Sequence, residues 1–183
     1  MRAVVVYESM YGNTHAVANA IGEGLHAAFQ VDVVPVEQAD QRLVTGADLV
    51  VVGGPTHAHG MSRASTRDAA VADAGKPDTQ LTLDPDAEGP GLRDWFAALP
   101  TVHARAAAFD TRVDLPAALT GRASKGIGRL LRKHGLDMVA DPESFLVTKH
   151  NQLEPDEAAR ARRWGARLAD TFAPGTVTAE SES

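Results

Sequence analysis

The stretch ESMYGNT, residues 8–14, offers hydroxyl, amide and backbone groups directly after an apolar run and before a helical pattern. Gly12 lets the backbone approach a ligand closely, and N–H groups at the start of a helix point outward, where the helix dipole favours an anion. Because the stretch has no Lys or Arg, neutral donors would hold a phosphate here. The candidate binding residues of this stretch are Ser9, Met10, Tyr11, Gly12, Asn13 and Thr14.

Other phosphate-binding motifs do not fit this stretch. The P-loop pattern GxxxxGK[ST] requires a Lys, and none follows Gly12. The dinucleotide pattern GxGxxG is also missing after the first apolar run. The residues alone therefore leave two interpretations open, a strand-to-helix turn with a capping residue or a charge-neutral anion site.

Two histidines lie in a second polar stretch, GPTHAHGMS, residues 54–62. His57 and His59 are separated by one residue, which is a possible metal pair, but no carboxylate or further His has supporting spacing. We therefore predict no metal site, and no nucleophile or acid–base pair suggests a catalytic residue.

Apolar runs and helical stripes that alternate along the chain place these polar stretches in an α/β fold. The runs predict buried strands at Ala3–Tyr7, Val31–Val36, Asp48–Gly53 and Arg105–Phe109, with a weaker one near Leu146–Thr148. Strands that alternate with helices imply right-handed crossovers and a parallel sheet covered on both faces. Ligands of such sheets bind beyond the carboxyl ends of the strands, here residues 8–14, 54–62 and 110–123.

The helical stretches are predicted from apolar residues that recur every three or four positions. Val17 begins one stripe, and Trp95 and Trp164 lie on two others, where a core position is expected. The stretch SKGIGRLLRKHG predicts a helix with a basic outer face, with Ser124 as its N-cap.

Length and composition fit one medium domain. The chain has 183 residues, 44% hydrophobic and 23% charged, with a formal net charge of −6 and dispersed cations. That balance argues against nucleic acid or an anionic membrane as a partner. The absence of cysteine excludes disulfides, zinc–thiolate sites and thiol nucleophiles. With no signal-peptide core and no apolar segment of membrane-spanning length, a cytoplasmic location is expected.

We predict a single domain over residues 1–173. Residues 63–91 are too long and polar for an ordinary connection and predict an insertion that acts as a lid, an interface arm or a mobile segment. Residues 174–183, PGTVTAESES, predict a disordered tail. A homo-oligomer is possible, with the insertion as its arm.

Two motifs at the correct separation resemble a known family. SMYGNT resembles the FMN phosphate loop of flavodoxin-like proteins, commonly written T/S-x-T-G-x-T, with Tyr11 in place of the middle Thr. The SMYG variant is also similar to the flavodoxin domains of flavodiiron proteins and to WrbA-type quinone reductases. VVVGGPTHAHG, residues 50–60, resembles the family's GSPTxxG. The resemblance covers residues 2–172 and implies a doubly wound five-stranded parallel sheet of order 2-1-3-4-5, with helices on both faces and FMN as cofactor.

The resemblance also implies which residues surround the flavin. The second loop would contact the flavin edge, with His57 as the ring neighbour, and the third would lie at the pyrimidine end. The cofactor-binding residues expected from these loops are Pro55, Thr56, His57 and Gly60, then Asp110, Thr111 and Arg112.

The sequence departs from electron-carrier flavodoxins on the ring side of the expected site. No Trp, Tyr or Phe occurs in residues 54–62 or 110–123, which carry several cationic groups instead. Positive charge would stabilise an anionic reduced flavin and so favours two-electron chemistry with NAD(P)H and a small acceptor.

Three functions stay open at this point. They are an FMN electron carrier with a redox partner protein, an FMN-dependent NAD(P)H:quinone-type oxidoreductase, and a flavodoxin-like binding module that has lost FMN. A signalling receiver domain fits poorly, because the third predicted strand ends VVVGGP without an acceptor Asp.

Overall fold

One mixed sheet organises the chain, whose computed structural model describes residues 1–57, 59–77, 79 and 81–173. The predicted tail, residues 174–183, lies outside the described residues. The parallel strands run in the order β2-β1-β3-β5-β6, and β7 pairs with β5 beyond β6, so the predicted order 2-1-3-4-5 is confirmed. The strands are β1 (Arg2–Tyr7), β2 (Gln30–Pro35), β3 (Leu49–His57), β4 (Gly60–Met61), β5 (Arg105–Val113), β6 (Asp137–Met138) and β7 (Glu143–Val147).

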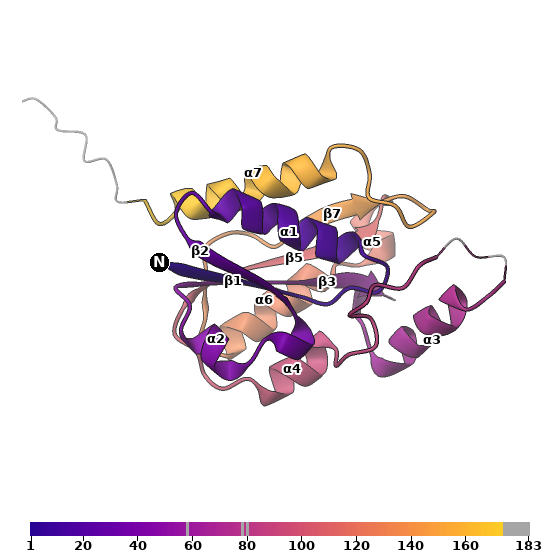
Figure 1. Cartoon of the computed structure of the whole chain (residues 1–183), viewed down its shortest axis with the longest axis horizontal. Helices are drawn as coiled ribbons and strands as arrows, with labels where there is room; N and C mark the ends of the chain where they lie inside the picture. Colours follow the sequence, from indigo (N-terminus) through magenta and orange to yellow (C-terminus); the bar gives the residue numbers. More distant parts are fainter. Residues whose placement is uncertain (58, 78, 80, 174–183) are drawn as a thin grey trace, which may run out of the picture.

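Helices cover both faces of the sheet, as predicted. In Figure 1, α1 and α7 lie above the sheet and α2, α4 and α6 lie below it. No helix in the described part of the chain is long and apolar enough to cross a membrane. The helices are α1 (Asn13–Leu25), η1 (Val36–Gln38), α2 (Gln41–Thr45), α3 (Ala64–Ala74), α4 (Leu92–Ala98), α5 (Ala117–Thr120), α6 (Ala123–Lys133) and α7 (Glu157–Asp170).

The apolar strands feed two cores because successive side chains point to opposite faces. Along β1, Val4 and Val6 belong to the core shared with α4 and α6, whereas Val5 belongs to the core shared with α1 and α7. Trp95 and Trp164 are buried in these two cores, as expected. Helices α1 and α7 pack very closely, since a Cβ at Gly24 would lie 2.1 Å from the carbonyl oxygen of Arg162.

Several boundaries in the structure differ from the predicted ones. Strands β3 and β5 run four residues further, to His57 and Val113, because their polar ends still pair with each other, for example Pro55 with Thr111. The fifth strand is divided into β6 and β7. Ser124 is not the N-cap of α6, because the helix begins at Ala123 and Arg122 is its N-cap.

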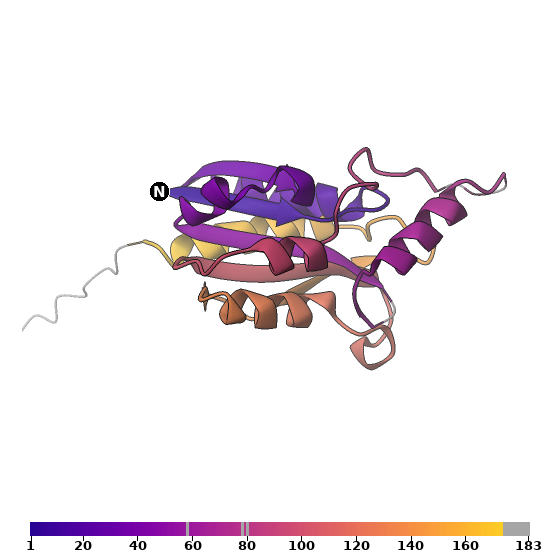
Figure 2. The ribbon, with the colours of Figure 1, turned by 90° about the horizontal axis from the view of Figure 1, so that it is seen from below.

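Within residues 63–91, α3 is followed by turns and irregular backbone among the described residues, which lead back to α4. Figures 1 and 2 both show α3 beyond the carboxyl ends of the strands, set apart from the three layers. A small cluster of Met10, Ala70 and Ala87 is buried between this segment and the loop after β1. The segment therefore packs against the predicted phosphate loop.

Candidate functional site

A cavity of about 230 Å³ opens where β1, β3 and β5 end. Its lining combines residues from all three predicted loops, although the second and third sets lie on the strand ends themselves. The described lining contains no Asp or Glu. The lining residues are Met10, Tyr11, Asn13, Thr14, Pro55, Thr56, His57, Thr111, Arg112, Val113, Val147 and Asn151.

The loop after β1 presents backbone donors at the first turn of α1. Gly12 has φ 86°, a left-handed conformation that favours glycine, and it precedes the helix as its N-cap. Its N–H donates to the Ser9 hydroxyl at 3.1 Å, so Ser9 shapes the loop from within and does not line the cavity. Within the described residues, no hydrogen bond leaves the backbone N–H groups of the four lining residues Met10, Tyr11, Asn13 and Thr14.

Side chains of this loop join it to neighbouring elements. The Thr14 hydroxyl lies 2.8 Å from that of Thr111 on β5, so two predicted residues distant in sequence meet. The Tyr11 hydroxyl donates to the carbonyl oxygen of Ala70 on α3 at 3.0 Å. Burial raises the pKa of the Tyr11 phenol, which therefore stays neutral. The loop is thus fixed to the sheet on one side and to α3 on the other.

His57 ends β3 at the edge of the cavity. Burial lowers the pKa of its imidazole, although the carboxylate of Glu8 acts in the opposite direction. The neutral form is therefore favoured beside the cavity at neutral pH. Gly60, also predicted, lies on β4 and lines two neighbouring cavities rather than this one.

Arg112 brings a positive charge into the described cavity lining. One of its Nη atoms donates to the carbonyl oxygen of Leu115 at 2.6 Å, which fixes the guanidinium. Its Nε atom is buried and has no hydrogen-bond partner among the described residues. A buried donor without a partner is costly, so a ligand acceptor would stabilise this position.

Asp110 does not line the cavity. It is fully buried within β5, and one carboxylate oxygen accepts the N–H of Ser124 at 2.7 Å. The carboxylate thus satisfies one orphan donor in the first turn of α6, and negative charge is favoured at that position. The sequence analysis expected Asp110 to bind the cofactor beside Thr111, but its carboxylate instead contacts the start of α6.

Three lining residues were not predicted, and Asn151 is the most polar of them. It has φ 58°, and its carbonyl oxygen accepts a hydrogen bond from the Asn13 amide at 2.9 Å. Its own Nδ2 atom is buried without a partner among the described residues. Asn is one of the residue types that adopt the left-handed conformation in turns, and this was the one signal in the sequence. The strand before Asn151 was only weakly predicted, so the sequence did not show that this turn lies at the cavity.

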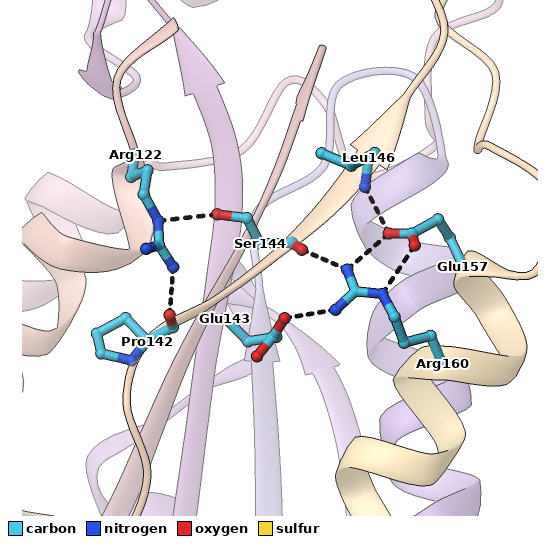
Figure 3. Close-up of polar contacts among 7 residues, drawn as sticks. All are labelled: Arg122, Pro142, Glu143, Ser144, Leu146, Glu157 and Arg160. Carbon is cyan, nitrogen blue, oxygen red and sulfur yellow. Dashed lines mark hydrogen bonds and ion pairs between the residues drawn. The ribbon is translucent and has the colours of Figure 1, made fainter. Parts of the chain in front are cut away.

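An ion-pair network holds the strand that leads to Asn151. Figure 3 shows Arg160 of α7 between Glu143 and Glu157, where it also donates to the carbonyl oxygen of Ser144. Glu157 accepts the N–H of Leu146 at 2.6 Å. Burial alone would raise the pKa of Glu157, but these donors lower it below its usual value. The network thus ties β7 to α7 and fixes the turn that follows.

Comparisons with known proteins agree with this arrangement. The flavodoxin family model matches residues 5–88, which include the loop after β1 and the end of β3. The matched stretch, which is somewhat less than half of the chain, is similar to the flavodoxin family. No curated protein matches the sequence.

Solved structures of flavodoxin-like proteins share the fold over nearly the whole chain. A flavodoxin from the domain Archaea is 21% identical, with a TM-score of 0.64 over 93% of this chain and 98% of that one. Oxidised flavodoxin 1 from Bacillus cereus is 16% identical, with a TM-score of 0.62 over 94% and 100%. Rubredoxin oxygen:oxidoreductase from Desulfovibrio gigas is 17% identical, with a TM-score of 0.56 over 93% of this chain but only 36% of that one.

Proposed function

We propose that the protein binds FMN non-covalently in the cavity at the ends of β1, β3 and β5 and takes part in electron transfer. The observation that carries the proposal is a set of four backbone N–H groups, in the loop before α1 and in its first turn, that have no hydrogen-bond partner among the described residues. Such a helix N-terminus suits a phosphate group and needs no Lys or Arg. Thr14 would add a hydroxyl donor to the same phosphate.

Two further donors of the cavity also suit FMN. The Arg112 Nε and the Asn151 Nδ2 atoms belong to lining residues and lack partners among the described residues. The described lining has no carboxylate that would repel a phosphate. When bound, FMN supplies one- and two-electron redox chemistry that the side chains do not supply. Arg112 would attract negative charge at the pyrimidine end, and a neutral His57 would border the ring.

Electron carriage is the function that the family favours, and an NAD(P)H:quinone-type oxidoreductase is the second candidate. Arg112 favours the second, because positive charge near a flavin stabilises its anionic reduced form. The partners would be a redox protein for the carrier, or NAD(P)H and a small acceptor for the enzyme. A single domain over residues 1–173, a cytoplasmic location and homo-oligomerisation through the insertion at 63–91 stay predictions.

Flavin content and affinity test the proposal. The purified protein should be yellow, and the protein freed of flavin should quench FMN fluorescence on titration. Thr14→Val should weaken FMN binding by about ten- to hundredfold, the loss expected for one hydrogen bond to a charged acceptor. Thr171→Val, which removes a hydroxyl at the remote end of α7, is the matched control. A colourless protein that does not quench FMN would contradict FMN binding and leave the flavin-free binding module.

A further inference from the structure

Two further cavities, of about 220 and 250 Å³, adjoin the candidate FMN cavity along the hairpin of β3 and β4. The first shares His57 with the FMN cavity, and the two share His59, Gly60, Met61 and Arg93 with each other. The three spaces therefore follow one another from the end of β3 to the start of α6. A ligand in the two further cavities would lie beside the flavin.

Cationic side chains dominate the polar lining of these two cavities. Arg63 lines the first, Arg122 and Arg129 line the second, and Arg93 lines both. The described lining of either cavity includes no Asp or Glu. This concentration of positive charge contrasts with the formal net charge of −6 for the chain.

The described residues do not neutralise these arginines. In the part of the chain that the structure describes, none of the four lies within 4.0 Å of a carboxylate oxygen. The nearby Glu8 is buried and accepts hydrogen bonds from the Ser62 hydroxyl and from the N–H of Leu92. These two donors already occupy the Glu8 carboxylate, so it does not pair with the arginines.

Hydrogen bonds to backbone and hydroxyl oxygens hold two of the arginines in place. The Arg93 Nε donates to the carbonyl oxygen of Ser62 at 2.9 Å. In Figure 3, Arg122 donates to the Ser144 hydroxyl and to the carbonyl oxygen of Pro142, whereas Glu143 turns to Arg160. Fixed guanidinium groups that bond only neutral oxygens keep their charge available, and their planar shape suits phosphate.

Backbone conformation at His59, one of the residues shared by both cavities, supports a binding role. His59 has φ 72°, an uncommon conformation for a non-glycine residue, and it forms a β-bridge with Gly121. A Cβ at Gly121 would lie 2.2 Å from the His59 carbonyl oxygen, so the hairpin is held tightly against the segment before α6. Such strain persists where the surroundings enforce it, commonly at ligand sites.

We infer that these two cavities bind a small organic anion with two separated phosphate groups, one near Arg63 and one near Arg122 and Arg129. Because the FMN cavity adjoins them, the ligand class is a phosphorylated redox substrate, and a nicotinamide dinucleotide carrying a 2′-phosphate has the required groups. This assignment of a substrate class rests on the proposed function. An acidic protein surface is the competing ligand, and the test below separates the two.

Calorimetric titration with NADP⁺ at low ionic strength tests the site, on protein with and without FMN. Arg63→Gln and Arg129→Gln, one for each cavity, should each weaken NADP⁺ binding about tenfold, the loss expected for one charge-assisted contact. Arg132→Gln removes the same charge from the same helix as Arg129, outside the described lining, and should leave the affinity unchanged. Binding of NAD⁺, which lacks the 2′-phosphate, should be weaker and insensitive to one of the two lining substitutions.

Two results would overturn the inference. One is that the unaltered protein binds neither NADP⁺ nor 2′,5′-ADP at millimolar concentration, which would leave an acidic protein as the ligand. The other is that Arg132→Gln weakens NADP⁺ as much as Arg129→Gln, which would mean a general effect of charge. FMN retention, measured by absorbance in the same samples, tests the proposed function independently of NADP⁺ binding. Loss of FMN with NADP⁺ binding intact would contradict only the proposed function.

Discussion

The loop after β1 and the β3–β4 hairpin both border the candidate FMN cavity, yet they hold opposite kinds of binding group. The loop offers backbone N–H groups and hydroxyls, and no residue of 8–14 is Lys or Arg. The hairpin and its neighbours offer four arginine side chains from different elements. One region would hold an anion through the direction of its backbone, the other through charge.

This difference predicts that the two regions would hold their anions with different strength and different exchange. Backbone donors at a helix N-terminus are already oriented before a ligand arrives, so little conformational entropy is lost on binding. Exposed arginines attract anions over a longer range but are screened by salt. We therefore expect a firmly held phosphate in the loop and a salt-sensitive, exchangeable anion along the hairpin.

The largest expected effect follows from changing the backbone of the loop. Gly12→Val places a β-branched residue at φ 86°, where an L side chain is strained by about 1–3 kcal/mol. Relaxation of that strain would turn the N–H groups away from the phosphate. FMN affinity, measured by fluorescence quenching, should fall by about a hundredfold or more, because several charge-assisted contacts weaken together.

Gly75→Val is the matched control for this substitution. Gly75 ends α3 with φ −81°, and a Cβ there would meet only ordinary contacts, the nearest at 3.6 Å. Its FMN affinity should equal that of the unaltered protein. If Gly12→Val bound FMN normally while folding correctly, the phosphate would have to lie outside this loop.

The same contrast explains what the sequence could predict. The loop is one continuous stretch, so its glycine, hydroxyls and helix start are visible together. The apolar runs predicted the strands, and the family resemblance implied their order. The polar ends of β3 and β5 escaped prediction because strand pairing continues there after the core has ended. Asn151 lines the FMN cavity from a turn, and Arg93 lines the further cavities from a helix. The residues beside them in space are far away in sequence, so no local pattern predicted their positions.

Arg112 tests whether charge also acts inside the FMN cavity. Arg112→Gln removes a positive charge from the cavity lining and should lower the two-electron potential of bound FMN by on the order of 20–60 mV. Redox titration against dyes of known potential would measure it. Arg105→Gln, at the opposite end of the same strand, is the control and should leave the potential unchanged. An unchanged potential in Arg112→Gln would place this guanidinium away from the ring.

His57 lies between the two regions, and its expected effect is the smallest. Burial lowers the pKa of its imidazole in the folded state below the ordinary value of 6.5. As the pH falls through 6.5, the unfolded chain takes up this proton before the folded protein does, so the free energy of unfolding decreases. One such group can change the free energy of unfolding by at most about 1.4 kcal/mol per pH unit.

Urea unfolding of the flavin-free protein at several pH values between about 7 and 5 measures this contribution. His57→Gln should flatten the fall in stability that accompanies acidification, because glutamine takes up no proton in either state. Thr171→Val, which removes no titratable group, is the control and should leave the slope unchanged. If His57→Gln also left the slope unchanged, the imidazole of His57 would be as accessible to protons as a surface group. The boundary between the loop and the hairpin would then be open to water, and an anion along the hairpin would be poorly shielded from solvent beside the flavin.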